Sequence, residues 1–361
     1  MNDDNLSRVN FVKNIFSHKL STVIFFVTSK CNSKCQGCFY WQNLNKNKDL
    51  TLKEIEKIIR NIGDIDHVLF SGGEPFLRED LPVICSLFRQ YNHMKSVSIP
   101  TNGLLTKTIP ATIEKIIMAN PELQVGVHFS LDGLAKTHDQ LRGVSGNFNK
   151  VVRSIKSLTR LQKKYPNIDI TVNTVISNKN YQELKNLVGF VKTLKIDSHT
   201  FDLLRTATKP SADLDLPPAA SLSAINNLRI YTRKYYVKDK SFWQRLFSLS
   251  KEYYLIAEQV KVLNRKKLSQ PCLAGQVTAV IHHDGKIGLC EKLPVIGDLR
   301  RHNYSFKAIW LSQKVNQQRE IITQHQCDCS HWCFLSLTVD HTPLTVFMRM
   351  PLNLLWQTIR H

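Results

Sequence analysis

The stretch STVIFFVTSKCNSKCQGCFYW, residues 21–41, joins a short apolar run to three closely spaced cysteines. The apolar run is far shorter than the roughly 20 residues that a membrane span needs, so we expect it to form a buried strand. Cys31, Cys35 and Cys38 follow it with the spacing C-x3-C-x2-C, and the next cysteine is Cys85. Because three thiolates leave a four-coordinate metal centre with one open position, this stretch indicates a reactive metal site directly after a strand.

The strand in this stretch is the first of six within residues 22–205, and each is followed by a helix-like segment. The strands are nearly continuous apolar runs, which is typical of a parallel sheet covered by helices. In the first helix-like segment, residues 50–62, the apolar side chains share one face, and Thr51 and Glu54 can form a capping box. We therefore expect an α/β fold built on a partial (β/α)6 TIM-like barrel, with its site at the carboxyl ends of the strands.

The composition of the chain changes after Arg205. The stretch TATKPSADLDLPPAASLS is rich in proline and alanine and is typical of a linker, and an aromatic-rich helical segment follows it. A second cysteine group lies further on. We expect five parts: an N-terminal extension at 1–20, the barrel at 21–205, a linker and helical segment at 206–269, a small cysteine-rich β-hairpin domain at 270–336, and an amphipathic tail at 337–361.

Nine cysteines are many for a chain of 361 residues, and they fall into two groups with one left over. This clustering is typical of metal binding in a reducing compartment and not of a secreted disulfide framework. The remaining thiol, Cys85, lies on an apolar helix face, where we expect an inert core residue. Since the sequence shows neither a signal-peptide cleavage site nor a membrane-spanning run, it predicts a cytoplasmic protein.

The formal net charge of the chain is +20. Such a charge can serve nucleic acid, an anionic membrane surface or an acidic redox partner. The basic residues are scattered and form no long block, so solvated helix faces account for most of the charge. We expect no nucleic acid to bind. A non-catalytic nucleic-acid-binding protein with structural metal sites nevertheless stays open as one alternative for the function.

Polar motifs follow the second, third and fourth predicted strands, at the edge of the sheet where the first cysteines also lie. In SGGEPFLR, adjacent glycines let the backbone approach a ligand closely, and the glutamate can accept hydrogen bonds from an amine. The motifs PTNG, SLDG and THDQLRG add an amide, a carboxylate and a guanidinium, and the guanidinium can pair with a carboxylate in a two-pronged contact. The candidate ligand-binding residues are Gly72, Gly73, Glu74, Asn102, Ser130, Asp132 and Arg142.

The second cysteine group surrounds a predicted hairpin. Residues 277–289 alternate in polarity around the preferred turn dipeptide Asp284-Gly285, so pairing of the strands brings Cys272 and Cys290 together. The later run CDCSHWC adds Cys327, Cys329 and Cys333. Five thiols therefore gather at one site, where a four-thiolate set would suit an iron–sulfur cluster or, as the alternative, zinc.

The C-x3-C-x2-C triad and the Gly-Gly-Glu turn make residues 20–205 resemble the radical S-adenosylmethionine (SAM) enzymes. The resemblance implies that the first three cysteines hold a [4Fe–4S] cluster whose fourth iron binds the amino and carboxylate groups of SAM. It also implies that the Gly-Gly-Glu turn contacts the methionine amine, and that Ser130 and Arg142 contact SAM. One departure is Gly37, where family members often have an aromatic residue, so the aromatic run after Cys38 is expected to line the pocket instead.

The second group resembles the auxiliary-cluster domain of the same enzymes, called SPASM in its full form and twitch in its short form. The likeness rests on a cysteine, a hairpin with the pattern G-x4-C and a later cysteine cluster. It implies one auxiliary [4Fe–4S] cluster, because the full form has more cysteines than this chain offers. Cys272, Cys290 and Cys333 are the firmer ligands, and Cys327 and Cys329 compete for the fourth place.

The resemblance implies an enzyme that reductively cleaves SAM to a 5′-deoxyadenosyl radical and abstracts hydrogen from a substrate. We predict oxidation or rearrangement of a small molecule, such as a sugar or a natural-product intermediate; the alternative is a peptide-modifying maturase of the SPASM type. An acidic flavodoxin or ferredoxin is the expected electron donor, which a basic surface would steer. Asp202, Asp284 and Glu291 are equal candidates for a catalytic base.

The tail MPLNLLWQTIRH, residues 350–361, places apolar side chains on one helical face behind Pro351. These side chains are Leu352, Leu355, Trp356 and Ile359. Packing of this face onto the protein itself is the first expectation, and docking on a membrane surface is the alternative.

Overall fold

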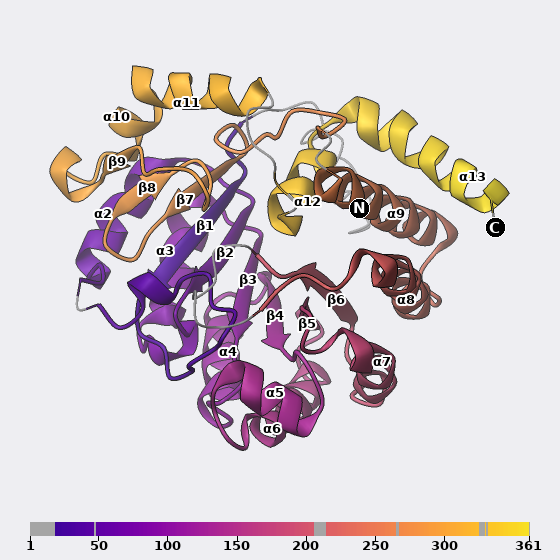
Figure 1. Ribbon diagram of the computed structural model, residues 1–361. Coiled ribbons are helices and arrows are strands. Elements are labelled where there is room, and N and C mark those ends of the chain that lie inside the picture. Colours follow the sequence, from indigo (N-terminus) through magenta and orange to yellow (C-terminus); the bar gives the residue numbers. More distant parts are fainter. Residues whose placement is uncertain are drawn as a thin grey trace.

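A sheet of nine strands runs through the centre of the structure (Figure 1). The computed structural model describes residues 19–46, 48–205, 214–264, 267–324, 329 and 331–360. The strands are β1 Thr22–Thr28, β2 His67–Gly72, β3 Ser96–Thr101, β4 Gln124–Ser130, β5 Ile168–Ile176, β6 Ser198–Leu203, β7 Thr278–Ile281, β8 Lys286–Gly288 and β9 Gly297–Asp298. They lie in the order β6-β5-β4-β3-β2-β1-β7-β8-β9.

Strands β1 to β6 are parallel and neighbour one another in chain order. Figure 1 shows the helices that follow these strands on the outer side of the curved sheet. Every residue of β1 is buried, because the strand has neighbours on both edges and packed layers on both faces. The predicted α/β fold with six strand–helix repeats is therefore confirmed.

The helices are α2 Leu52–Ile62, α3 Leu81–Asn92, α4 Thr108–Ala119, α5 Ala135–Arg142, α6 Asn147–Gln162, α7 Leu184–Lys192, α8 Leu222–Tyr236, α9 Phe242–Leu263, α10 Phe306–Trp310, α11 Gln313–Thr323, α12 Trp332–Asp340 and α13 Met350–Arg360. The sequence patterns predict α2, α3, α4, α6 and α7 to within a few residues, but they do not predict α5. The capping box of Thr51 and Glu54 is present at the start of α2, as predicted.

The hairpin of the second cysteine group continues the barrel sheet. Strand β7 pairs in parallel with β1 from Thr22 opposite Thr278 to Phe25 opposite Ile281, and β8 then pairs antiparallel with β7. Gly285 closes the turn with a φ of +87°, a conformation that favours glycine. The regions that carry the two cysteine groups are thus joined through adjacent strands of one sheet. The division of the chain into five parts stays a prediction.

A smaller apolar cluster lies away from the sheet, among the C-terminal helices. Its core consists of Tyr254, Leu255, Leu335, Val339, Val346 and Met350. Helix α13 lies alongside α9 (Figure 1), so the tail does pack onto the protein, although Leu352 and Leu355 on it remain exposed. The side chains of Trp356 and Ile359 lie outside the described part.

Some predicted features fall outside the described residues. They are positions 1–18 of the N-terminal extension, positions 206–213 of the linker, and Cys327. Within the part that is described, no helix combines the length and the apolar character that crossing a bilayer requires.

Candidate active site

The first three cysteines lie in the loop that follows β1, at the carboxyl edge of the sheet. Cys31, Cys35 and Cys38 are all partly exposed there. The Asp49 carboxylate holds the start of the loop, since it accepts hydrogen bonds from the Thr28 hydroxyl at 2.6 Å and from a backbone N–H at 2.9 Å. The loop is therefore fixed to the sheet at its first residues while its sulfur atoms stay within reach of a ligand.

The electrostatics of this loop suit a positively charged ligand. Burial raises the pKa of the Cys31 thiol to about 12, the backbone N–H of Ser33 lowers it, and the nearby charges of Cys35, Cys38 and Glu74 raise it further. Three thiolates therefore repel one another unless a cation lies between them. An iron–sulfur cluster fits this set, because its irons supply the positive charge and leave one coordination position open.

The Gly-Gly turn after β2 passes directly beneath the cysteine loop. A Cβ atom on Gly73 would overlap the carbonyl oxygen of Lys30, and one on Gly72 would overlap that of Thr28. The Gly73 N–H donates to the Thr28 carbonyl, and the Glu74 N–H donates to the Lys30 carbonyl, each at 2.8 Å. The two glycines are thus required for contact between the turn and the loop; their contact with a ligand stays a prediction.

Glu74 ties three strand ends together from a buried position. Its carboxylate accepts hydrogen bonds from the Thr101 hydroxyl at 2.9 Å and from the Asn102 N–H at 2.8 Å. The Asn102 amide in turn donates to the Asn32 side chain in the cysteine loop at 2.7 Å. Burial raises the pKa of Glu74 to about 7, although these hydrogen bonds lower it. Glu74 and Asn102 are therefore placed beside the cysteines, as the sequence predicts.

Arg142, at the end of α5, carries a fixed positive charge to the cysteine loop. One terminal nitrogen pairs with Asp132 at 2.7 Å, and the other donates to the sulfur of Cys35 at 3.7 Å. Burial alone would lower the pKa of the guanidinium, but Asp132 and Cys35 hold it above its ordinary range. Its Nε atom is buried and has no hydrogen-bond partner among the described residues. This donor is available to an acceptor that the protein itself does not supply.

Ser130 lies one strand further from the cysteine loop than Asn102, which follows β3. It ends β4 and stands opposite Asn173 of β5. The Asn173 amide donates to the Asp202 carboxylate of β6 at 3.1 Å. Ser130 therefore lies at the same carboxyl edge as the other candidates, and its role stays a prediction.

Three of the four described cysteines of the second group share one local geometry. Each sulfur accepts a backbone N–H from the residue two positions later: Cys272 from Ala274 at 3.4 Å, Cys290 from Lys292 at 3.4 Å, and Cys329 from His331 at 3.3 Å. Such N–H···S hydrogen bonds stabilise the thiolate form and tune iron–sulfur centres. This geometry supports Cys329 as a ligand.

The thiols of the second group lie close to one another and to the mouth of the barrel. Burial raises the pKa of Cys290 to about 12, the Lys292 N–H lowers it, and Cys329 and Cys272 raise it as neighbouring charges. Burial also raises the pKa of Cys333 to about 12, with Asp202 of β6 as the next cause. No three His, Cys, Asp or Glu side chains in the described ranges converge as the ligands of a single ion would. Ligands of a cluster bind separate irons and need no such convergence.

A partly buried ion pair connects the two cysteine groups. The Arg205 guanidinium donates to the Glu291 carboxylate at 2.6 Å and lies 4.2 Å from the centre of the Phe39 ring. Phe39 follows Cys38, and Glu291 follows Cys290. His331 also contacts Glu291, at 2.9 Å. Although burial would raise the pKa of Glu291, Arg205 and His331 lower it to about 2, so this side chain is held as a carboxylate.

The other base candidates have different surroundings. Asp284 lies in the hairpin turn, where Lys286 pairs with it at 2.6 Å, and Asp202 accepts the Asn173 amide. Arg205 and His331 were not among the residues predicted from the sequence. Position alone could have pointed to them: Arg205 lies directly after the last barrel strand, and His331 lies inside the CDCSHWC run.

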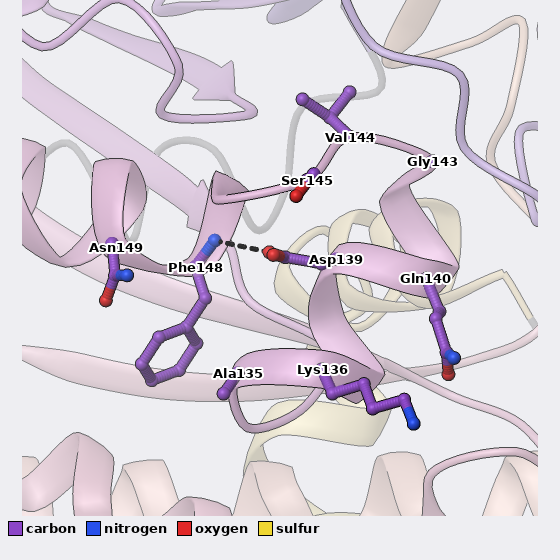
Figure 2. Close-up of a pocket in the computed structure, with 9 residues that line it drawn as sticks. All are labelled: Ala135, Lys136, Asp139, Gln140, Gly143, Val144, Ser145, Phe148 and Asn149. Atoms are coloured by element: carbon purple, nitrogen blue, oxygen red, sulfur yellow. Dashed lines mark hydrogen bonds between the residues drawn. The ribbon is translucent and has the colours of Figure 1, made fainter.

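A separate open pocket of about 490 Å³ lies on the outer surface between α5 and α6 (Figure 2). Asp139 projects into it, but its carboxylate accepts the N–H groups of Gly146 and Phe148 at 2.5 and 2.8 Å. The only carboxylate that lines the pocket is therefore already hydrogen-bonded to the backbone at the start of α6. None of the candidate site residues lines the pocket.

Two family models match the chain at the two cysteine groups. Residues 25–191 match the radical SAM superfamily, and residues 272–333 match an iron–sulfur cluster-binding domain, SPASM. The chain therefore belongs to the radical SAM superfamily and carries a SPASM-type auxiliary-cluster domain. These domains imply the cofactors that the sequence predicts: a SAM-binding [4Fe–4S] cluster, an auxiliary [4Fe–4S] cluster and SAM itself.

Two curated relatives come from Methanosarcina barkeri (strain Fusaro / DSM 804). An Fe-coproporphyrin III synthase is 27% identical over 226 residues, which is 61% of this chain but only 53% of that protein. An AdoMet-dependent heme synthase is 26% identical over 305 residues, or 80% of this chain and 81% of that protein.

Solved structures share the fold along nearly the whole chain. The structure of anSMEcpe with bound AdoMet has a TM-score of 0.63 at 18% identity, over 95% of this chain and 93% of that one. SuiB of Streptococcus suis, bound to S-adenosylmethionine, has a TM-score of 0.56 at 17% identity, over 87% and 71%. At such identities the likeness concerns the fold alone.

Proposed function

We propose that this protein is a radical SAM enzyme that oxidises a small molecule, using both cysteine groups. The observation that carries the proposal is their joint placement, since β1 and β7 are adjacent strands and Arg205 links Phe39 to Glu291. When bound at the first group, SAM supplies a 5′-deoxyadenosyl radical on reductive cleavage, and this radical abstracts hydrogen from a substrate.

The residues around the first group would hold and orient SAM. Cys31, Cys35 and Cys38 would ligate the cluster. The free Nε donor of Arg142 would meet a SAM carboxylate, while Asp132 keeps the guanidinium in place. Gly72, Gly73, Glu74, Asn102 and Ser130 would line the methionine side of the site.

The residues of the second group would hold a cluster that accepts the electron left on the substrate radical, while a proton is released. We assign Cys272, Cys290, Cys329 and Cys333 to one auxiliary cluster, because the first three are buried and close to one another and Cys333 lies at the barrel mouth near Asp202. Arg205 and Glu291 would form the polar wall between the two cofactors. Loss of one hydrogen atom and one further electron makes the reaction a net oxidation.

One relative that is covered nearly throughout supports a small-molecule substrate. The heme synthase matches four fifths of both chains, and its name says that it makes heme. A peptide substrate is the second candidate, because the fold is shared with SuiB, which was also solved bound to the precursor peptide SuiA, with a TM-score of 0.58.

The electron donor that we propose is an acidic flavodoxin or ferredoxin. Lys30, Lys34, Lys46 and Lys48 are exposed around the cysteine loop. These charges would steer an acidic carrier to the partly exposed cysteines. Reduction of the first cluster by such a carrier should then slow as ionic strength rises.

The test of the proposed function is formation of 5′-deoxyadenosine. Protein reconstituted anaerobically with iron and sulfide receives SAM and a strong reductant, beside a variant with Cys31, Cys35 and Cys38 changed to Ala. The matched control is Cys85→Ala, which removes a fully buried thiol outside both groups. We expect product from the wild type and the control alone; no product from cluster-loaded wild type would overturn the proposal. Fractionated small molecules and peptides, added separately, distinguish the two substrate classes by their stimulation of turnover.

A further inference from the structure

Large apolar side chains are exposed on the paired helices α9 and α13 and on the turn before α13. Trp243 at the start of α9 is 68% exposed, and Leu352 on α13 is 60% exposed. Phe242, Leu344, Phe347 and Met348 are also exposed. We call these six side chains the C-terminal apolar surface. Figure 1 shows α9 and α13 side by side, on the side of the molecule away from α2 and α3.

The same segments also have a second apolar face, which is buried inside the protein. The exposed apolar side chains therefore take no part in that internal packing. Val346 and Met350 lie in the small core cluster with residues of α9 and α12. Leu344, Met348 and Leu352 recur at intervals of four, which places them on another face of the helical segment. A helical segment that is apolar on two faces needs a second apolar environment.

The charges nearby restrict what that environment can be. Residues 341–361 contain no Asp or Glu. Lys240 and Arg245 are exposed at the start of α9, where the acidic neighbour is Asp239, and Lys234 is exposed in the last turn of α8. A second copy of the chain would bring the same positive charges face to face, which is unfavourable. An anionic surface is complementary to them.

We propose that the C-terminal apolar surface docks on an anionic lipid bilayer. Trp and Phe side chains favour the headgroup region, where a ring meets the acyl boundary, and Lys and Arg meet lipid phosphates. No described helix is able to cross a bilayer, so we expect the helices to lie on the surface of the bilayer. This inference concerns a region away from both cysteine groups and does not depend on the proposed function.

The experiment is sedimentation of the full chain with phosphatidylcholine vesicles, with and without phosphatidylglycerol. We expect binding to the anionic vesicles, weakened by salt. A variant with Trp243, Met348 and Leu352 changed to Gln should bind at least about tenfold more weakly, since apolar burial and charge act together. The matched control is Leu311→Gln, which changes a leucine that is 72% exposed on the C-terminal side of α10.

Three results would overturn the inference. They are no sedimentation with anionic vesicles, equal loss of binding in the Leu311→Gln control, and a change of the triple variant from oligomer to monomer in light scattering. The last result would mean that a second copy covers the surface. Circular dichroism and iron content show that each variant is folded, so a failure to fold is not mistaken for a loss of binding.

Discussion

At the scale of single residues, Gly73 decides whether the cysteine loop can close over the turn after β2. A Cβ atom there would overlap the Lys30 carbonyl oxygen, and backbone cannot yield as a side chain would. Gly73→Ala should therefore displace the loop and lower the iron content of the first site, with the second site unaffected. The matched control is Gly189→Ala, because a Cβ atom at that exposed helix position meets nothing within 4 Å. Equal iron content in the two variants would contradict this account.

The partly buried pair of Arg205 and Glu291 predicts a clear cost when one partner is removed. Glu291→Gln leaves a guanidinium that is only 25% exposed without its counter-charge, so the free energy of unfolding should fall by about 2 kcal/mol. The control is Glu56→Gln, which breaks an exposed pair with Arg60 and should cost less than about 0.5 kcal/mol. Anaerobic urea unfolding measures both. An inactive Glu291→Gln protein of unchanged stability would instead assign the carboxylate to catalysis.

His199 on β6 predicts a loss of stability in mild acid. The ring is buried against Phe201, and burial lowers the pKa of His199 to about 3. Between that value and an unfolded pKa of 6.5, the unfolded chain binds a proton that the folded chain does not, so stability falls as the pH falls. From pH 7.5 to 5.5, this residue should cost about 1.4 kcal/mol.

The check is urea unfolding of wild type and His199→Met at both pH values. Whatever the absolute stability of the variant, its loss between the two pH values should be smaller by the amount above. An identical pH dependence in both proteins would show that the pKa of His199 is the same in the folded and the unfolded chain.

At the scale of secondary-structure elements, the pairing of β7 with β1 predicts that the two strands open together. The backbone N–H groups of Ser21 and Thr22 both donate to the Val277 carbonyl at 3.0 Å, and His341 contacts the Ser21 hydroxyl at 3.1 Å. Hydrogen exchange measured by mass spectrometry should give residues 278–281 the same protection as β1. Faster exchange of the hairpin with β1 still protected would show a separately folding domain.

Elements with local signals were predictable from the sequence. The capping box of Thr51 and Glu54 depends on two residues three positions apart, and the Asp284-Gly285 turn depends on two neighbours, so both patterns suffice on their own. The pairing of β7 with β1 joins residues more than 250 positions apart and has no local signature. Helices α5, α10, α11 and α12 were also not predicted individually, because α5 lies within a candidate binding motif and the other three begin in a stretch expected to form a small β-hairpin domain.

The candidate site shows the same division. The cysteines and the Gly-Gly-Glu turn were identified because their spacing is specific. The contact of Arg142 with Cys35 and the bridge from Phe39 through Arg205 to Glu291 were not, because each joins separate strand ends. Such contacts follow from the curvature and order of the sheet, which the chain reveals only once it is folded.

At the scale of the whole molecule, one sheet carries two thiolate sites with different surroundings. The first lies in a partly exposed loop with basic neighbours, and in the second Cys272, Cys290 and Cys329 are buried. This difference suits a site that receives electrons and SAM, and a second site that accepts an electron from substrate. The central claim is that both sites hold iron–sulfur clusters in the same chain.

Iron and sulfide analysis with Mössbauer spectroscopy tests that claim most directly. We predict about eight irons per chain in the wild type, all in [4Fe–4S] clusters, and about four in each of two variants. One variant has Cys31, Cys35 and Cys38 changed to Ala, and the other has Cys272, Cys290 and Cys329 changed to Ala. About four irons in the wild type, with zinc accompanying the second group, would contradict the account.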